Sequence, residues 1–265
     1  MVPEQPGTAQ VRPAAASRLR SLLGLAAVFA LLVVSYQQVS FNFSSLFTGA
    51  RDFFNFFPRL APDFTAWPQI WPPLVDTIRI AYVATIIGTL IAMPLIFLAS
   101  ENTTINTPVR IIARTILTIL RSIPDMLWAA LFVAVIGLGE LPGVFALVFF
   151  TIGVLSKLGS ETVEAADPGP IEALRATGAG RNRTIMFAVV PQVAATMMSY
   201  ILYSFEINVR ASVVIGFVGA GGIGQLLQRY LNFFDYSGLG ALIVIIFVAV
   251  LIIDAISVWA RSKLI

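Results

Sequence analysis

The chain has 265 residues, of which 58% are hydrophobic and only 12% charged, and its mean hydropathy is +0.88. Soluble domains carry about a quarter charged residues, so these values indicate a membrane protein. The absence of Cys and His excludes disulfide scaffolds, thiol nucleophiles, Cys/His zinc sites and Ser-His-Asp triads. The net charge of +3, from 17 basic and 14 dispersed acidic residues, also argues against a nucleic-acid surface.

Six stretches come near the roughly 20 apolar residues that a membrane-crossing helix needs. We therefore predict an all-α polytopic membrane protein with about six transmembrane helices. The fourth stretch is the shortest and carries Lys157 near its end, where a lysine can extend to the membrane interface. The six predicted spans are 22–39, 74–99, 116–137, 143–159, 184–205 and 239–260.

The first stretch has two interpretations. Arg12, Arg18 and Arg20 precede an apolar run of the length found in secretory signals. The run continues into Ser35-Tyr36-Gln37-Gln38-Val39 rather than a small-x-small cleavage site, which favours an uncleaved span. We expect residues 1–20 to form a cytoplasmic tail and residues 21–265 to form one transmembrane domain.

Residues 40–73 form an aromatic and proline-rich segment between the first two spans. Phe53-Phe54-Asn55-Phe56-Phe57 and the pair Trp67 and Trp71 give it rings that are favoured at the membrane interface. We predict an outside segment that partly lies in this interface.

The positions of the basic residues predict the orientation, because Lys and Arg collect in cytoplasmic loops. With the N-terminus inside, eleven lie in cytoplasmic segments: Arg12, Arg18, Arg20, Arg110, Arg114, Lys157, Arg175, Arg181, Arg183, Arg261 and Lys263. Four lie outside: Arg51, Arg59, Arg210 and Arg229. Both termini are therefore predicted to be cytoplasmic.

A cytoplasmic loop, residues 160–183, contains the signals of a short surface helix. The run from Asp167 to Gly178 has Pro168 at a first helical position, Glu172 in the expected first turn and Gly178 where a helix would end. A second short turn follows at residues 181–184. From these residues alone, an ordinary connection between two spans remains as good an interpretation as a functional one.

The same loop resembles the EAA loop of binding-protein-dependent ABC importer permeases. The family pattern is Glu-Ala-Ala, Gly after three more residues, and Ile-x-Leu-Pro after nine more. The chain keeps this spacing at Glu172-Ala173-Leu174, Gly178 and Pro191, with apolar exchanges at Leu174, Ala188 and Val190. The resemblance implies a coupling helix that docks into a cytoplasmic ATPase subunit. The residues predicted to couple are Glu172, Ala173, Leu174, Arg175, Gly178 and Pro191.

The second loop, residues 206–238, is expected outside and is rich in glycine. Its Gly219-Ala220-Gly221-Gly222-Ile223-Gly224 imitates a dinucleotide-binding fingerprint, but a transmembrane stretch follows instead of a βαβ unit. Glycine-rich backbone at the membrane edge needs protein or a water-filled cavity to satisfy its polar groups. A gate of a transport pathway and a tightly packed turn are both compatible with this composition.

Together with the preceding Glu206-Ile207-Asn208-Val209-Arg210-Ala211-Ser212, this run resembles the permease of phosphonate ABC importers. Methionine importer permeases share the Gly-Ala-Gly-Gly-Ile-Gly part. A further element, Leu120-Arg121-Ser122-Ile123-Pro124, recurs in both groups. The resemblance covers about residues 70–265 and implies type I ABC importer permease architecture.

Charged residues near the membrane come in pairs at helical spacing: Asp76 with Arg79, Arg121 with Asp125, and Glu206 with Arg210. They either neutralise one another structurally or hold arginines along an anion route, because guanidinium matches phosphonate and phosphate geometry. The residues predicted for the translocation pathway or gate are Arg121, Glu206, Asn208, Arg210, Ser212, Gly219, Gly221, Gly222 and Gly224.

The energy source is predicted to lie outside the chain. No Gly-x-x-x-x-Gly-Lys-Ser/Thr motif is present, because Lys157 and Lys263 are each followed by leucine. The resemblance implies separate ATPase subunits that bind ATP, an external phosphonate-binding protein and a second permease copy or paralogue. It implies no cofactor, metal or catalytic residue in this chain.

Two alternatives come from other functional classes. An ion-coupled secondary transporter of an anionic solute would use acidic groups within the membrane, such as Asp125 and Asp254. A membrane-embedded enzyme without His or Cys would need paired carboxylates, and Asp254 has no obvious partner in sequence. The sequence predicts an inner-membrane permease that performs no chemistry itself, with the secondary transporter as its main competitor.

Overall fold

The computed structural model describes residues 15–38 and 43–264. The chain divides into two units, one up to Phe57 and one from Pro58 onward. The helices of the first unit are α1 (Ala15–Gln38) and α2 (Phe43–Phe56). Helix α1 begins within the expected tail; residues 1–14 and Val39 lie outside the described residues.

The first unit contains one span-like helix and one amphipathic helix. Residues 20–38 of α1 pass the length and hydropathy requirements of a span, and none of that window is buried within the structure. In α2 the ring of Phe53 packs against Phe54 at 5.9 Å and Phe57 at 5.8 Å. The mixture of exposed aromatic and polar residues in α2 fits the predicted interfacial segment.

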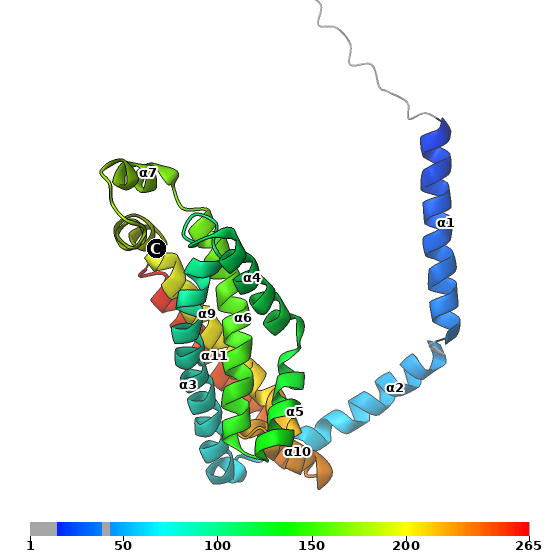
Figure 1. Cartoon of the computed structure of the whole chain (residues 1–265). Helices are drawn as coiled ribbons and strands as arrows, with labels where there is room; N and C mark the ends of the chain where they lie inside the picture. The colour runs from blue at the N-terminus through cyan, green and yellow to red at the C-terminus, as the bar shows by residue number, and fades with distance from the viewer. Residues whose placement is uncertain (1–14, 39–42, 265) are drawn as a thin grey trace, which may run out of the picture. The chain divides into compact units, whose positions relative to one another are not determined.

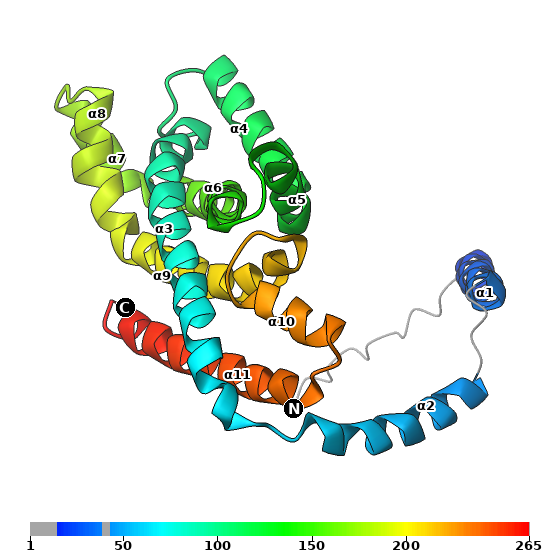
Figure 2. The ribbon, with the colours of Figure 1, turned by 90° about the horizontal axis from the view of Figure 1, so that it is seen from below.

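The second unit is a helical bundle whose elements follow in this order: η1 (Phe57–Leu60, which crosses the unit boundary), η2 (Phe64–Ala66), α3 (Trp67–Ala99), α4 (Thr107–Ser122), α5 (Asp125–Ile136), α6 (Glu140–Glu164), α7 (Pro168–Ala176), α8 (Arg181–Thr184), η3 (Ile185–Val189), α9 (Val190–Ile215), η4 (Gly216–Val218), α10 (Ile223–Asn232) and α11 (Tyr236–Arg261). Helix α6 packs against α3, α4, α5 and α9, while α11 packs against α9 and α10 (Figure 2).

The bundle has two distinct ends. Helix α7 and the C-terminal end of the chain lie towards one end, and α10 lies at the other (Figure 1). We refer to them as the α7 end and the α10 end. The second half of α5 and the start of α6 are at the α10 end, so successive long helices alternate in direction as a membrane bundle requires.

The described residues contain five helices long and apolar enough to cross a membrane, or six if α4 and α5 count as one bent span. This agrees with the predicted number. Several spans are longer than expected: α3 begins at Trp67 rather than residue 74, so both tryptophans and Pro72 and Pro73 belong to the helix. Helix α6 extends from Glu140 to Glu164 instead of 143–159.

The predicted spanning helix over 116–137 is not one continuous helix. Helix α4 ends at Ser122, α5 begins at Asp125, and their axes differ by 86°. Pro124 lacks an amide hydrogen and disfavours helical backbone in the residue before it, which breaks the helix at Ile123. Helix α5 has 12 residues, about 18 Å, and is too short to cross a membrane alone.

Close contact between α3 and α6 forms the centre of the bundle. A Cβ added at Gly88 would lie 2.6 Å from the Cβ of Thr151, and one added at Gly159 would lie 2.5 Å from Ile96 Cδ1. Small residues allow helices to approach closely where lipid offers no hydrophobic driving force for their association. These two glycines therefore allow α3 and α6 to approach closely at two points of their contact.

Candidate functional site at the α7 end

Helix α7 forms as the sequence predicts. The side chain of Asp167 accepts a hydrogen bond of 2.9 Å from the amide of Gly169, and Pro168 occupies the first helical position. Gly178 follows the helix with φ +78°, a left-handed conformation that glycine adopts without strain. The expected first-turn position of Glu172 is wrong, because the helix begins at Pro168 and Glu172 is its fifth residue.

The two faces of α7 differ in what they contact. Ile171 is 4% exposed and belongs to a core cluster with residues of α3, α6 and α9, and Leu174 packs against the same cluster. Glu172 and Ala173 are exposed. Leu174, grouped with the coupling residues by sequence, thus helps to anchor the helix, while Glu172 and Ala173 form part of its free face.

The loop between α3 and α4, residues 100–106, connects the α7 region to the bundle. Arg175 Nη2 donates to the carbonyl of Asn102 at 3.1 Å, and Arg181 Nε donates to the carbonyl of Thr103 at 2.6 Å. The Asn102 side chain in turn donates to the carbonyl of Val163 at 2.6 Å. The loop therefore joins α7 and α8 to the end of α6.

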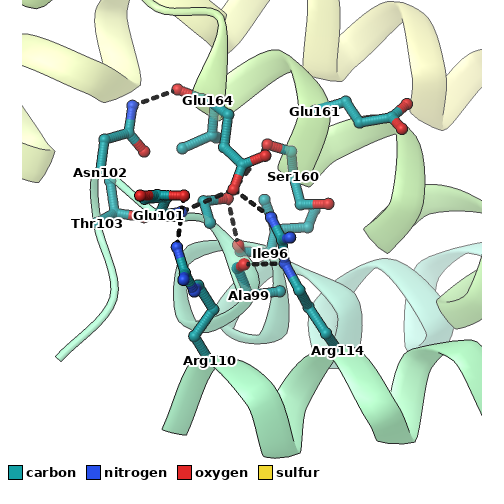
Figure 3. Close-up of polar contacts among 12 residues, drawn as sticks. Ile96, Ala99, Glu101, Asn102, Thr103, Arg110, Arg114, Ser160, Glu161 and Glu164 are labelled. Carbon is teal, nitrogen blue, oxygen red and sulfur yellow. Dashed lines mark hydrogen bonds and ion pairs between the residues drawn. The ribbon is translucent and has the colours of Figure 1, made fainter. Parts of the chain in front are cut away.

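An ion-pair network fixes the other side of this loop (Figure 3). Glu164 pairs with Arg114 of α4 and accepts a hydrogen bond of 2.8 Å from the amide of Glu101. Glu101 pairs with Arg110 of α4 at 2.5 Å. Since both arginines lie on α4 and both carboxylates on neighbouring segments, α4 is tied to the same loop that holds α7.

The π-helical turn η3 connects α8 to α9. Pro191, predicted inside a span, is the second residue of α9, and only Val190 separates it from this turn. Proline cannot donate the usual intrahelical hydrogen bond, and a wider turn is a common way to accommodate that loss. Thus Pro191 marks the boundary where the helix changes geometry.

A buried carboxylate lies further along α9. Glu206 is 6% exposed and pairs with both Arg210 of the same helix and Arg261 at the end of α11, the latter at 3.1 Å. The predicted Glu206–Arg210 pair is confirmed. The predicted outside loop is wrong at its start, because residues 206–215 continue α9 as helix.

This geometry also corrects the orientation count. Arg210 was assigned to an outside loop and Arg261 to a cytoplasmic segment, yet both reach the same carboxylate. Each arginine therefore lies within the reach of its side chain from Glu206, and the two are at a similar depth in the bundle. Arg210 cannot be counted with the basic residues of the α10 end.

Two further predicted pathway residues are buried among the helices. Asn208 is 0% exposed and its Nδ2 donates to the hydroxyls of Thr85, at 2.8 Å, and Thr151, at 2.7 Å. Ser212 is 1% exposed and donates to the carbonyl of Val209 in its own helix. Asn208 thus joins α3, α6 and α9, whereas the side chain of Arg210 is 49% exposed.

The glycine-rich turn is packed within the chain. Gly219, Gly221 and Gly222 have φ of +87°, +84° and +70°, which explains glycine at these positions. The amide of Ile223 donates to Thr77 Oγ1 at 2.7 Å, which joins the start of α10 to α3. A Cβ on Gly224 would lie 2.1 Å from the carbonyl oxygen of Val213, so this glycine allows α10 to pack on α9.

The remaining predicted charge pairs differ in outcome. Arg79 and Asp76 pair at 3.3 Å, as expected. Among the ion pairs of the described residues, none joins Arg121 to Asp125, because the break after Ser122 removes their helical spacing. Arg121 instead lines a cavity with residues of α6.

Sequence reasoning missed several residues at the α7 end. Arg261 was read only as a topology signal, and Glu101 and Asn102 were not singled out. Arg110 and Arg114, four residues apart, were a detectable signal of a basic face on one helix. Local sequence signals did not distinguish residues 101–103, because their hydrogen-bond partners Glu164, Val163, Arg175 and Arg181 lie more than 60 positions away, although Arg110, the ion-pair partner of Glu101, is nearby in the chain.

Several relatives and solved structures are similar to the chain. It is 37% identical over 233 residues to the phosphate-import permease protein PhnE of Mycolicibacterium smegmatis, covering 88% of this chain but only 44% of that protein's length. It is 37% identical over 198 residues to the phosphite transport system permease protein PtxC of Stutzerimonas stutzeri, covering 75% and 72% of the two chains. The fold matches a structure of the MetNI methionine ABC transporter in an inward-facing conformation, with TM-score 0.66, 19% identity and coverage of 77% and 99%.

A family match extends over most of the second unit. Residues 92–264, from the last two turns of α3 to the end of the described chain, match the family described as binding-protein-dependent transport system inner membrane component. The match includes α7, the bent α4–α5 pair and the Glu206 pairs, which are the features assembled above. The chain therefore belongs to this family of multi-pass inner-membrane transport components.

Proposed function

We propose that the chain is the permease subunit of an ATP-driven ABC importer for phosphonates or related phosphorus oxyanions, such as phosphite, phosphate or phosphate esters. An external binding protein would deliver the substrate, and separate ATPase subunits would hydrolyse ATP. The similarity to a phosphate-import permease and to a phosphite transport system permease supports this substrate class. The permease would work with a second copy or a paralogue and would itself catalyse no reaction.

One observation supports the mechanism: α7 has one exposed face and one face packed against the bundle. Glu172 and Ala173 are exposed, while Ile171 is buried in the bundle core. A partner that pushes or pulls on the free face therefore moves residues packed against α3, α6 and α9. Interiors are close-packed, so displacement of such a residue is transmitted rather than absorbed locally.

The attached loop extends this connection to α4. Arg175 and Arg181 hold residues 102 and 103. The same loop pairs with Arg110 through Glu101 and is linked to Arg114 through Glu164, which accepts from the amide of Glu101. Motion of α7 would therefore reach α4, and through the break at Pro124 it would reach α5. We infer that α7 and α8 form the element that couples ATPase closure to rearrangement of the pathway.

In this proposal the α7 end faces the cytoplasm, both termini are cytoplasmic and the α10 end faces outward. Arg210 contributes a partly exposed positive charge to the anion route, and Glu206 moderates its attraction for the substrate. The glycine-rich turn would contribute to the outer gate through the movement of α9 and α10.

The test is co-purification of the chain with ATPase and binding-protein subunits in lipid, followed by an ATPase assay with and without phosphonate-loaded binding protein. Wild type is expected to show stimulated hydrolysis, and Glu172→Arg is expected to lose the stimulation because it reverses charge on the free face of α7. Asp52→Arg is the matched control, since Asp52 is an exposed carboxylate on α2.

Failure of the ATPase to associate, with uptake that follows an ion gradient, would contradict the proposal. It would favour the secondary transporter, for which Asp254 on α11 would be the first residue to neutralise. Equal stimulation in Glu172→Arg and wild type would instead contradict the assignment of α7 while leaving the ATP-driven mechanism in place.

A further inference from the structure

A cavity of about 280 Å³ lies between α4, α6 and the end of α3. Three cationic side chains line it, Arg114, Arg121 and Lys157, together with the two carboxylates Glu161 and Glu164. The cavity shares Arg114 and Glu164 with the network of Figure 3. It therefore lies beside the loop that holds α7.

The charges of this cavity do not balance. Glu164 pairs with Arg114, and Glu161 pairs with Lys157. Arg121 takes part in none of the ion pairs found among residues 15–38 and 43–264. The lining thus carries one positive charge in excess, and this charge belongs to Arg121.

The position of Arg121 is set by its backbone. A Cβ added to Gly153 of α6 would lie 3.4 Å from both Cα and Cβ of Arg121, so α4 approaches α6 closely at this point. Arg121 is the last arginine before the break at Pro124. The backbone of Arg121 is consequently held against α6, while the residue as a whole is exposed and lines the cavity.

The hydroxyl groups of the lining leave the guanidinium as the main free donor. Thr118 donates to the carbonyl of Arg114 at 2.7 Å, and Ser160 donates to the carbonyl of Lys157 at 3.1 Å. A hydroxyl has one proton, so neither group has a second hydrogen to offer in this arrangement. A guanidinium presents a planar fork of donors that matches two oxygens of a tetrahedral phosphorus oxyanion.

We propose that this cavity binds a tetrahedral phosphorus oxyanion through Arg121. The inference rests on the proposed function and deepens it, since it assigns a substrate-class site to the cytoplasmic end of the pathway. The same chemistry is present in the phosphate of an inner-leaflet lipid headgroup. The opposite face of α4 exposes Ile112 and Ile119 by 60% and 56%, which would bring such lipids close.

The first experiment measures binding of methylphosphonate and inorganic phosphate to the full chain in nanodiscs of phosphatidylcholine, by ³¹P NMR line broadening. We expect saturable binding in wild type and at least about tenfold weaker binding in Arg121→Gln, because a charge-assisted bidentate contact is lost. Arg121→Lys should recover part of the affinity through its charge. Arg229→Gln, an exposed arginine of α10, is the matched control and should bind like wild type.

The second arm identifies the source of the oxyanion. Nanodiscs that contain phosphatidylglycerol are analysed by native mass spectrometry for retained lipid, with and without methylphosphonate. A lipid that wild type retains, that Arg121→Gln loses and that methylphosphonate does not displace would identify the headgroup as the occupant. Displacement by methylphosphonate would identify the free anion.

The proposal would be overturned if wild type bound neither free anion and retained no lipid that Arg121→Gln loses, or if Arg121→Gln and Arg229→Gln gave equal binding in both arms. Size-exclusion profiles and thermal unfolding establish that each variant is folded. If Arg121→Gln lost anion binding but kept phosphonate-stimulated ATPase activity in the assembled transporter, the proposed function would still hold. Failure of the ATPase to associate would contradict the proposed function but not the binding measured on the chain alone.

Discussion

At the scale of single residues, the most constrained charge is Glu206. It is buried on α9 and forms ion pairs with two arginines from two different helices. Removing one partner from a buried ion pair is costly because an uncompensated charge is left behind. The sequence showed the partner four residues away, Arg210, but Arg261 lies 55 positions along the chain and only folding brings it to the same carboxylate.

We expect Glu206→Gln to lower the free energy of unfolding by about 3 kcal/mol, since two guanidinium groups then share one neutral amide. The measurement is unfolding in mild detergent, followed by circular dichroism. Asp76→Asn is the control: its partner Arg79 is 71% exposed, so the loss should stay below about 1 kcal/mol. Equal losses in the two variants would contradict a structural role for the Glu206 cluster.

At the scale of elements, the short loop at residues 100–106 connects α6, α7 and α8. It accepts hydrogen bonds from Arg175 and Arg181 and donates to Glu164 of α6. The loop has no regular secondary structure, so these long-range contacts add to a few turn hydrogen bonds, such as that from the amide of Thr104 to the carbonyl of Ser100, in holding it in place. Helices α7 and α8 are correspondingly held by contacts to a segment that the sequence pattern does not mark.

Arg181→Ala is expected to loosen this connection. The carbonyl of Thr103 loses its 2.6 Å donor, so amide hydrogen exchange in residues 100–106 and 168–176 should accelerate several-fold. Hydrogen–deuterium exchange with mass spectrometry measures the change. Arg183→Ala is the matched control, since Arg183 is also an exposed arginine of α8, and an equal acceleration in that variant would contradict the role assigned to Arg181.

At the scale of the whole molecule, the structure strengthens the expected bias of basic residues towards one end of the bundle. Arg210 moves out of the outside group, which leaves Arg51, Arg59 and Arg229 of the four basic residues first assigned there. The arginines that hold the α3–α4 loop all lie at the α7 end. The bias of basic residues towards that end supports the proposed orientation, in which the α7 end faces the cytoplasm.

The natural absence of cysteine allows a direct test of this orientation. Thr177→Cys, at the α7 end, should react with a membrane-impermeant maleimide only after the cells are permeabilised. Phe233→Cys, which follows α10 at a position 78% exposed, should react in intact spheroplasts. The reverse pattern would contradict both the proposed orientation and the docking of an ATPase on α7.

The sequence by itself determined the class, the approximate number of spans and helix α7, because each depends on local signals. Apolar run length fixes whether a segment can cross a membrane, and Asp167, Pro168 and Gly178 are sufficient to start and stop a short helix. The effect of Pro124 was also local, but a continuous apolar run concealed it. The continuation of α9 as far as Ile215 was missed for a different reason: its charged residues resembled a loop.

Only the tertiary structure decided which charges meet and which glycines pack. The pairs of Arg114 with Glu164 and Arg261 with Glu206, and the approach of Gly88 to Thr151, join residues of different helices. Such contacts depend on helix direction, tilt and rotation, which a helix's own sequence leaves open. Arg121 shows the consequence: its expected partner was four residues away, but the break at Pro124 removed that neighbour and the packing of α4 on α6 placed the arginine at a cavity instead.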